Sequence, residues 1–452
     1  MAKYTPIIGL EVHVELKTNS KMFCSCSADY FGKEPNSHTC PVCLGLPGAL
    51  PVPNKTAIEW CIKISHSLNC KINSFSKFDR KNYFYPDLAK GYQISQYDLP
   101  FGYEGFITLS TGKRIGITRV HMEEDTGKLS HQEINGKKAS LIDFNRSGVP
   151  LVEIVTEPDF HDALEVKEYL QKLQQIVRYL DVSNADMEKG EMRLEPNISL
   201  ALSSSLKGVS NNSPFPSKLL PNYKVEVKNI NSFRFVEKAI NYETKRQEEI
   251  LEEGERPAQE TRGWDENRQK TFSQRSKEEA HDYRYFPEPD IPPIITSKDE
   301  ISTILSSVPE LPVKKLQRFM HEFSLPEYDS EILTREISLA NYFEEAVLAG
   351  KEKSIKPKEI ANTIINKKVD ISQITPLSLI TQIVSSKQTA TVDQGELVKI
   401  IDTVISENTK AVEDYKNGKE PVLMFLVGQT MKKIGKKVDV NIVKEKIESI
   451  IK

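Results

Sequence analysis

The sequence predicts an α+β fold in which a β-rich first part is followed by helical parts. From Tyr4 to about residue 293, short alternating runs are interrupted by a few stretches with helical spacing. Beyond four prolines at positions 287, 289, 292 and 293 the pattern is almost wholly helical, and it changes again near Thr391. Because proline ends regular structure, we expect three domains, over residues 1–293, 294–390 and 391–452.

Composition excludes several classes of protein. The 452 residues are 38% hydrophobic and 28% charged, with a formal net charge of −3. No apolar run approaches the roughly 20 residues that span a bilayer, and Met1-Ala2-Lys3 leads almost directly into the first predicted strand, so we expect neither a signal peptide nor a membrane role. The charge argues against a general nucleic-acid coat but allows a local basic patch for one structured RNA.

The first predicted strand, residues 7–16, has one polar and one apolar face. Glu11, His13 and Glu15 share the polar face, and the other carries Ile8, Leu10, Val12 and Val14. Two or more carboxylates beside an imidazole suit a divalent metal or a phosphate. A half-buried strand with a solvated polar face is the alternative, and for this segment alone it is the commoner one.

Two close pairs of thiols follow this strand: Cys24, Cys26, Cys40 and Cys43. Their spacing predicts a closed tetrahedral Zn²⁺ site with a structural role, in an insertion over residues 24–43. Gly45 lets backbone N–H groups approach the sulfur atoms. Disulfides are the competing interpretation, but six cysteines in 452 residues are not a disulfide framework.

Three further segments gather charged side chains. Residues 80–87, Arg-Lys-Asn-Tyr-Phe-Tyr-Pro-Asp, combine two cations with three aromatic rings, which suits a phosphate and a base or ribose. His121-Met-Glu-Glu-Asp125 ends a β-branched strand with three adjacent acids, which are most stable around a cation. Residues 143–153 form a polar loop and a strand that ends in Glu153. Each segment alone could be structural, but together they favour a phosphoryl-transfer surface on a sheet.

Local patterns also place the helices and one later strand. We expect a helix capped by Asp162 that continues to residue 180, a strand over 223–229 and a helix from Ser232 to Gly254. In the helical parts, the spacing predicts one helix over residues 331–350 and short helices over 396–405 and 423–433. The sequence has no phosphate-binding P-loop and no dinucleotide glycine motif, so ATP, if it is used, lies on the sheet.

Eight ordered blocks of residues make the chain resemble a known family, the B subunit of the three-subunit aspartyl/glutamyl-tRNA amidotransferase. These blocks are Gly9–Leu16, Arg80–Asp87, Gly91–Gln96, His121–Asp125, Asn145–Asp159, Lys228–Phe233, Gln259–Gly263 and Asp282–Asp290. The resemblance covers most of the chain. It implies an antiparallel-sheet cradle of the glutamine-synthetase-like type, followed by an all-α helical domain and a small helical tail domain that holds tRNA.

The resemblance also implies an activity, cofactors and partners. Members phosphorylate the side-chain carboxylate of Glu-tRNA(Gln), and often of Asp-tRNA(Asn), with ATP and Mg²⁺, and then amidate it with ammonia. The ammonia comes from a glutaminase A subunit, around which a small C subunit wraps. Zinc on the four cysteines occurs in some members. We expect a ligase of this type in the cytoplasm, and a zinc-stabilised tRNA-binding subunit with a decayed kinase site is the alternative.

Site residues follow from the matching blocks. Glu11, His13, Glu124 and Glu195 resemble Mg²⁺ ligands, with Glu124 also at a gate. Lys81, Tyr83 and Lys90 resemble catalytic residues of the phosphate and channel region, and Arg80, Lys81 and Tyr85 are expected to bind ATP. Strict alternation places Glu123, not Glu124, beside His121, but the resemblance favours Glu124. Glu153 is a weaker candidate.

The chain departs from the family pattern at four places, two of which are a shortened helical region near Thr391 and a tail that has Val427–Gly435 without the usual Lys-Gly-Lys-Ala-Asn-Pro end. Arg193-Leu-Glu-Pro-Asn197 stands where the family has Arg-Cys-Asp-Ala-Asn, so Glu195 is one methylene longer than the expected aspartate. Residues 203–221 form an added loop rich in serine, proline and asparagine. The tail keeps basic side chains that suit phosphate contacts, although a solvated face is the default for each: Lys432, Lys433, Lys436 and Lys437.

Overall fold

The chain forms two compact units, Met1–Lys315 and Leu316–Lys452. The computed structural model describes residues 3–206, 219–276, 283–387, 394–435, 438 and 440–451. The first unit continues past residue 293, because α4 (Lys298–Ser306) and the turn after it pack Leu305 and Val308 against the first core. Thr391 and the border expected near it lie outside the described residues, as does most of the loop over 203–221.

A nine-stranded sheet forms the centre of the first unit. Every neighbouring pair is antiparallel except β12 and β13, which run parallel. The strands, in spatial order, are β14 (Lys270–Ser276), β13 (Glu260–Asp265), β12 (Val225–Lys228), β11 (Met192–Leu202), β1 (Tyr4–Glu15), β10 (Pro150–Thr156), β7 (Arg114–Glu124), β6 (Gly102–Thr108) and β2 (Lys71–Ile72). A large sheet in the first unit and helices in the second confirm the mixed α and β class.

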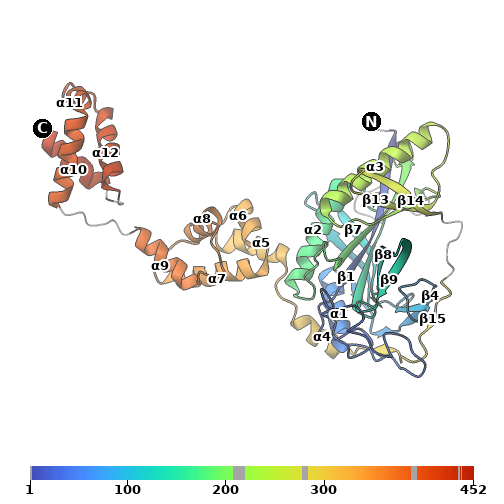
Figure 1. Cartoon of the computed structure of the whole chain (residues 1–452). Helices are drawn as coiled ribbons and strands as arrows, with labels where there is room; N and C mark the ends of the chain where they lie inside the picture. The colour runs from blue at the N-terminus through green and yellow to red at the C-terminus, as the bar shows by residue number, and fades with distance from the viewer. Residues whose placement is uncertain are drawn as a thin grey trace. The chain divides into compact units, whose positions relative to one another are not determined.

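The two faces of β1 have the predicted character. Ile8, Leu10, Val12 and Val14 are at most 1% exposed and belong to the first hydrophobic core. Three helices contribute to the same core: α1 (Lys55–Ser67), α2 (Ala163–Tyr179) and α3 (Phe233–Glu252). Figure 1 shows these helices on one side of the large sheet and β4 and β15 on the other. The polar face of β1 therefore lies on the side of the sheet opposite the helical layer.

The helix starts predicted in the first unit are confirmed. The carboxylate of Asp162 accepts hydrogen bonds from the backbone N–H groups of Leu164 and Glu165, and the Ser232 hydroxyl accepts one from Phe235. Such caps satisfy N–H groups that have no partner inside the helix. They also fix where α2 and α3 begin over the sheet.

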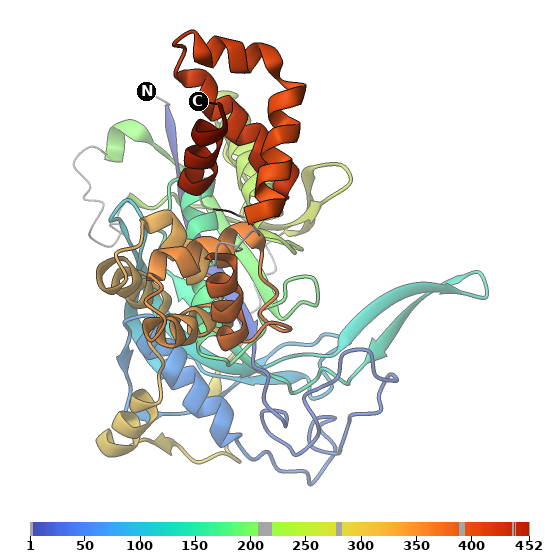
Figure 2. The same cartoon turned by 90° about the vertical axis from the view of Figure 1, so that its left-hand side faces the viewer.

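Smaller sheets border the polar face. One contains β15 (Phe286–Pro287), β4 (Asp79–Asn82) and β5 (Tyr92–Ser95), and another pairs β16 (Ile294–Ile295) with β3 (Phe75–Ser76). The hairpin of β8 (Lys128–Ile134) and β9 (Lys137–Asp143) turns at Asn135-Gly136, where both residues have positive φ. Figure 2 shows this hairpin extending away from the rest of the first unit.

The second unit consists of helices around two separate hydrophobic cores. Residues 319–383 surround one core and residues 397–451 the other. The helices are α5 (Pro312–Glu322, which begins in the first unit), α6 (Glu327–Leu333), α7 (Ile337–Lys351), α8 (Pro357–Lys367), α9 (Pro376–Lys387), α10 (Gln394–Glu407), α11 (Thr409–Lys416), α12 (Pro421–Ile434) and α13 (Val440–Ile451). The predicted helices over 396–405 and 423–433 are confirmed as parts of α10 and α12. In the described part of the chain, the search for a helix that could cross a membrane finds none.

The single helix predicted over 331–350 is wrong, because the chain breaks between α6 and α7. The Thr334 hydroxyl donates to the carbonyl of Ser330 at 2.7 Å, and Glu336 adopts an extended conformation before α7 starts. A threonine hydroxyl that bonds to the preceding turn competes with helix propagation. The apolar spacing continues across this break, so periodicity alone does not reveal it.

Candidate active site

Five neighbouring strands, β12, β11, β1, β10 and β7, build the polar face of the sheet. In their register, Glu11 lies opposite Glu195, and His13 lies opposite Glu153. Glu153 in turn lies opposite His121. Because side chains alternate with a period of two, this register puts acids and imidazoles from distant segments on one face.

The first acidic group consists of His13, Glu123 and Glu153, whose possible ligand atoms all lie within 4.8 Å of one another. His13 Nε2 is 3.5 Å from Glu123 Oε1 and 3.7 Å from Glu153 Oε2, and His121 Nε2 is 3.0 Å from Glu153 Oε2. Burial disfavours the charged form of Glu153, but His121 and then His13 outweigh it and hold its pKa well below the ordinary value.

The second acidic group consists of Glu11, Glu195 and Glu226, again within 4.8 Å of one another. Burial, and then the charges of Glu153 and Glu195, raise the pKa of Glu11. Burial also opposes the charge of Glu195, but Lys228, whose Nζ lies 2.8 Å from Glu195 Oε2, lowers the pKa of that carboxyl. One acid of the group is therefore held ionised while its neighbour resists ionisation.

Both groups fit a divalent metal by the chemistry of their donors. Crowded carboxylates such as Glu11 gain from a cation, because it neutralises the repulsion between them. The amide of Asn197 donates to Glu11 Oε1 at 3.0 Å, while Asn197 Oδ1 is buried and makes no hydrogen bond within the described part of the chain. Glu195 reaches the group despite its extra methylene.

Cations and aromatic residues complete a hollow of about 220 Å³ over these acids. Its polar lining includes Lys81, Tyr83, Arg193, Lys228 and Tyr283. Burial opposes the charge of Lys81, but Glu123, and then Tyr285 and Glu153, raise its pKa. Lys81 therefore stays charged beside the acids, as binding of a polyanion requires.

The side chain of Glu124 does not join either acidic group and is paired with Lys90 instead. Lys90 Nζ donates to Glu124 Oε1, and the backbone N–H of Ile94 donates to the same oxygen at 2.9 Å. Among the described residues, neither acidic group contains Glu124; Glu123 occupies that place beside His13. Alternation along β7 explains this, since consecutive residues of a strand face opposite sides. The metal-ligand role predicted for Glu124 stays a prediction, and the geometry favours Glu123.

Arg80 and Tyr85 do not line the hollow over the acids. The Arg80 guanidinium forms a forked pair with the buried Glu288, at 2.7 and 2.8 Å, and lies 4.3 Å from the centre of the Tyr92 ring. The side chain of Tyr85 is 57% exposed. Their predicted contacts with ATP stay predictions, and Arg80 has a structural partner in any case.

The four predicted zinc ligands meet in space. The Sγ atoms of Cys24, Cys26, Cys40 and Cys43 lie within 4.8 Å of one another. The backbone N–H of Cys40 donates to Cys43 Sγ at 3.1 Å, and the buried Lys21 Nζ lies 3.7 Å from the same sulfur atom. The pKa of the Cys43 thiol is lowered to about 4, first by the hydrogen bond from Cys24. This donor set fits a tetrahedral Zn²⁺ ion.

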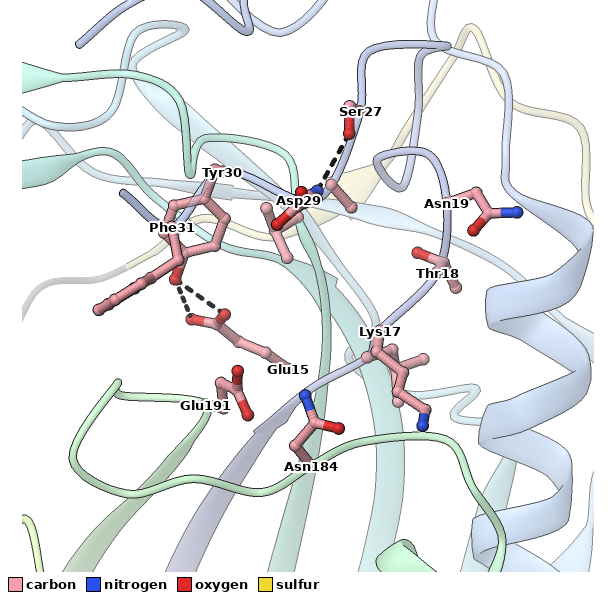
Figure 3. Close-up of a pocket in the computed structure, with 13 residues that line it drawn as sticks. Glu15, Lys17, Thr18, Asn19, Ser27, Asp29, Tyr30, Phe31, Asn184 and Glu191 are labelled. Atoms are coloured by element: carbon pink, nitrogen blue, oxygen red, sulfur yellow. Dashed lines mark hydrogen bonds between the residues drawn. The ribbon is translucent and has the colours of Figure 1, made fainter. Parts of the chain in front are cut away.

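A second polar pocket, of about 250 Å³, lies at the end of β1 (Figure 3). The Tyr30 hydroxyl donates to Glu15 Oε2 at 3.0 Å. Burial, and then the charge of Asp125, raise the pKa of Glu15 well above its ordinary value. Asp125 forms ion pairs with Arg146 and Arg193, so Glu15 belongs to a buried ionic cluster beside the acidic groups.

Fold and site together define a class, that of proteins in which one face of a sheet carries clustered acids beside half-buried cations. Comparisons with known proteins identify the family within this class. Residues 6–302 match the family described as the GatB/GatE catalytic domain, and residues 317–451 match the GatB domain.

Curated proteins give the same result over nearly the whole chain. The B subunit of the aspartyl/glutamyl-tRNA(Asn/Gln) amidotransferase of Carboxydothermus hydrogenoformans is 46% identical, over 96% of this chain and 95% of that protein. Its counterpart in Thermosipho melanesiensis is 45% identical over 97% of each chain, and that of Thermodesulfovibrio yellowstonii is 44% identical over the full length of both. The chain therefore belongs to the family of tRNA-dependent amidotransferase B subunits, which are ligase-type enzymes.

Sequence reasoning missed one member of the acidic groups and undervalued two. Glu226 lies between Lys224 and Lys228 on an alternating strand, a pattern that is common on solvated faces. Only the pairing of β11 with β12, which sets Glu226 opposite Asn197, brings it to Glu11. For Glu123 the signal was available, because alternation along its own strand places it on the face of His121, whereas Glu153 comes opposite His121 only through the pairing of β10 with β7.

Proposed function

We propose that this subunit converts Glu-tRNA(Gln), Asp-tRNA(Asn) or both into the amide at the polar face of its sheet. One observation carries the proposal: two acidic groups, from five strands, lie beside half-buried cations in one hollow. This is the composition that in-line transfer of a phosphoryl group requires. We also propose that the first unit is a glutamine-synthetase-like cradle and that the protein is located in the cytoplasm.

The acids have the role of holding metal. His13, Glu123 and Glu153 form one candidate Mg²⁺ site, and the second consists of Glu11, Glu195 and Glu226. When bound there, Mg²⁺ supplies Lewis-acid polarisation of phosphate oxygens and neutralises charge. Glu195 thus stays a proposed Mg²⁺ ligand, although the family pattern has an aspartate at this position.

The cations have the role of neutralising the reactants. Lys81 and Lys228 stay charged in the hollow and hold the phosphates of ATP beside the substrate carboxylate, two anions that otherwise repel each other. A carboxylate oxygen then attacks the γ-phosphorus, the bond to ADP breaks, and an acyl phosphate forms. Ammonia attacks the acyl carbon, inorganic phosphate leaves, and the amide remains.

The pair of Lys90 and Glu124 has a role in the ammonia step. Both side chains are at most 10% exposed, and Glu124 directly follows Glu123 in the sequence. We propose that they guard the acyl phosphate until ammonia arrives from a glutaminase A subunit, held by a small C subunit. Tyr83 lines the hollow, where it excludes water from the intermediate.

The test is conversion of labelled Glu-tRNA(Gln) and Asp-tRNA(Asn) by the chain purified with its A and C partners, ATP and Mg²⁺. Amide is expected with glutamine and with ammonium chloride. Glu226→Gln should abolish both, while Glu255→Gln, at an exposed position, should change neither. Bound tRNA without any amide from either nitrogen source would overturn the proposal in favour of a tRNA-binding subunit with a decayed kinase site.

A further inference from the structure

The turn that follows the third thiol is fixed to the thiol cluster. Inside it, the backbone N–H of Leu44 donates to the carbonyl of Cys40 at 3.1 Å, and that of Gly45 donates to Val42 at 3.0 Å. The N–H of Cys40 donates to Cys43 Sγ. Because these bonds connect backbone and sulfur within one tight turn, the position of Gly45 depends on the position of the thiols.

Gly45 is packed against Lys90. A Cβ atom on Gly45 would lie 2.4 Å from Lys90 Cγ, closer than real Cβ atoms approach, and 3.2 Å from Lys90 Cα and Cβ, which is tighter than most real contacts. Gly45 also has a φ of +66°, which favours glycine for a second reason. Gly48, three residues on, has a φ of +83°, but a Cβ atom there would have no neighbour within 4 Å. The two glycines share the backbone constraint and differ in the contact.

Lys90 in turn is connected to the polar face. Its ammonium donates to Glu124 and lies 5.5 Å from the centre of the Tyr92 ring. Glu124 is fixed by Ile94, whose N–H donates to the carboxylate, and by Gln93, whose amide donates to the Glu124 carbonyl at 2.6 Å. A displacement of the Lys90 stem therefore alters the side chain next to Glu123.

A second route runs from the thiols to the same strand end. Lys21, which is fully buried, donates to the carbonyl of Phe144 at 3.4 Å, and Ser147 donates to the carbonyl of Cys43 at 3.3 Å. The N–H of Gly148 donates to the carbonyl of Asp125 at 2.9 Å. The loop over 144–148 thus lies between the thiol cluster and the residue that follows Glu124.

We propose that the thiol cluster is a positioning device for the active site: when zinc is bound, the turn at Gly45 sets the place of Lys90 and so of its partner Glu124. Zinc loss then loosens this pair without removing any residue of the acidic groups. The inference rests on the proposed role of Lys90 and Glu124 in amide formation.

Hydrogen exchange on the full chain tests the connection directly. In Gly45→Ala the backbone amide of Ile94, which donates a hydrogen bond to Glu124, should exchange about tenfold faster. Loss of a hydrogen bond to a charged group changes the opening equilibrium of an amide by at least about that factor. Zinc content should stay at the level of the unaltered chain. Gly48→Ala carries the same backbone constraint without the contact and should leave the exchange of Ile94 unchanged. The zinc-free chain should repeat the effect, with α2 unaffected as an internal reference.

Activity supplies the second measurement. In complex with the A and C subunits, Gly45→Ala should lower the rate of ammonium-dependent amide formation and Gly48→Ala should not. Unchanged exchange at Ile94 in both Gly45→Ala and the zinc-free chain would overturn the inference. If the unaltered complex forms no amide, the proposed function fails, but the exchange result still decides whether the thiol cluster positions Lys90.

Discussion

Glu123 and Glu124 are adjacent acids with different surroundings. Glu123 lies 3.5 Å from His13 on the polar face, whereas Glu124 is paired with Lys90 and bonded to the N–H of Ile94. Two buried acids on opposite sides of one strand cannot substitute for each other, because a period of two separates their faces. Neighbouring positions therefore give a matched pair for separating metal binding from later steps.

We expect Glu123→Gln to weaken binding of Mn²⁺, used as a spectroscopic substitute for Mg²⁺, because it removes a charged oxygen ligand. Glu124→Gln should leave Mn²⁺ affinity, folding and tRNA binding intact but abolish amide formation. Electron paramagnetic resonance titration measures the first effect and the tRNA assay the second. Normal turnover in Glu124→Gln would contradict its catalytic assignment, and equal loss of Mn²⁺ affinity in both variants would contradict the distinction.

The pKa of Glu15 predicts how the stability of the fold depends on pH, because burial and then the charge of Asp125 raise this pKa in the folded chain. In the unfolded chain this carboxyl loses its proton above about pH 4.3. The folded chain keeps the proton, so the stability contributed by Glu15 is complete below that pH and falls as the pH rises toward the folded-state pKa. The fall amounts to about 1.4 kcal/mol for each pH unit in that interval.

Glu15→Gln should therefore raise the melting temperature near neutral pH and have little effect near pH 4. The amide can accept from Tyr30 and donate toward Asp125, as the protonated acid does. Melting curves between pH 4 and pH 8 measure the difference. A shift of the same size at every pH would show that packing, and not the proton, sets the effect.

At the scale of elements, the small sheet of β15, β4 and β5 contains an ion pair between Arg80 of its central strand β4 and Glu288, the residue after β15. Glu288 has a fully buried side chain, and its charge is compensated by the fork of Arg80. Removal of one partner of a buried pair typically costs about 3–5 kcal/mol, because the other charge stays buried. Arg80 therefore has a stabilising role in the fold that is independent of nucleotide binding.

Arg80→Met should lower the melting temperature markedly, and the double variant Arg80→Met with Glu288→Gln should recover much of the loss. The KM for ATP should stay the same in both, because Arg80 lies outside the lining of the hollow. Calorimetry and the tRNA assay at varied ATP concentration measure the two quantities. A large rise in KM with little loss of stability would instead support the original expectation that Arg80 binds ATP.

Elements were predictable from sequence where local chemistry determines them. The faces of β1, the caps at Asp162 and Ser232 and the spacing of the thiols follow from short-range rules, and the structure has them all. The break at Thr334 and the arrival of Glu226 at the acidic group were not predictable. The first depends on one hydroxyl inside a continuing apolar pattern, and the second on strand register set by tertiary packing.

At the scale of the whole molecule, the described residues form separate hydrophobic cores in the two units. The core around the sheet lies within the unit that ends at Lys315, and the two helical cores consist of residues beyond it. Every residue of both acidic groups and of the thiol cluster belongs to the first unit. The candidate active site and the proposed tRNA-holding tail are thus encoded in separate parts of the chain. Lys436 and Lys437 of that tail lie outside the described residues.

A chain that ends at Lys315 should consequently fold, keep its zinc and bind Mn²⁺ like the full chain, because its core and both acidic groups are complete. With the A and C subunits it should form amide at a similar maximal rate but with a KM for tRNA raised at least about tenfold, since the tail supplies phosphate contacts. The rise should shrink as salt increases, because contacts with phosphates weaken with ionic strength. An unchanged KM would remove the tail from tRNA binding, and loss of zinc or Mn²⁺ binding would show that the first unit does not fold alone.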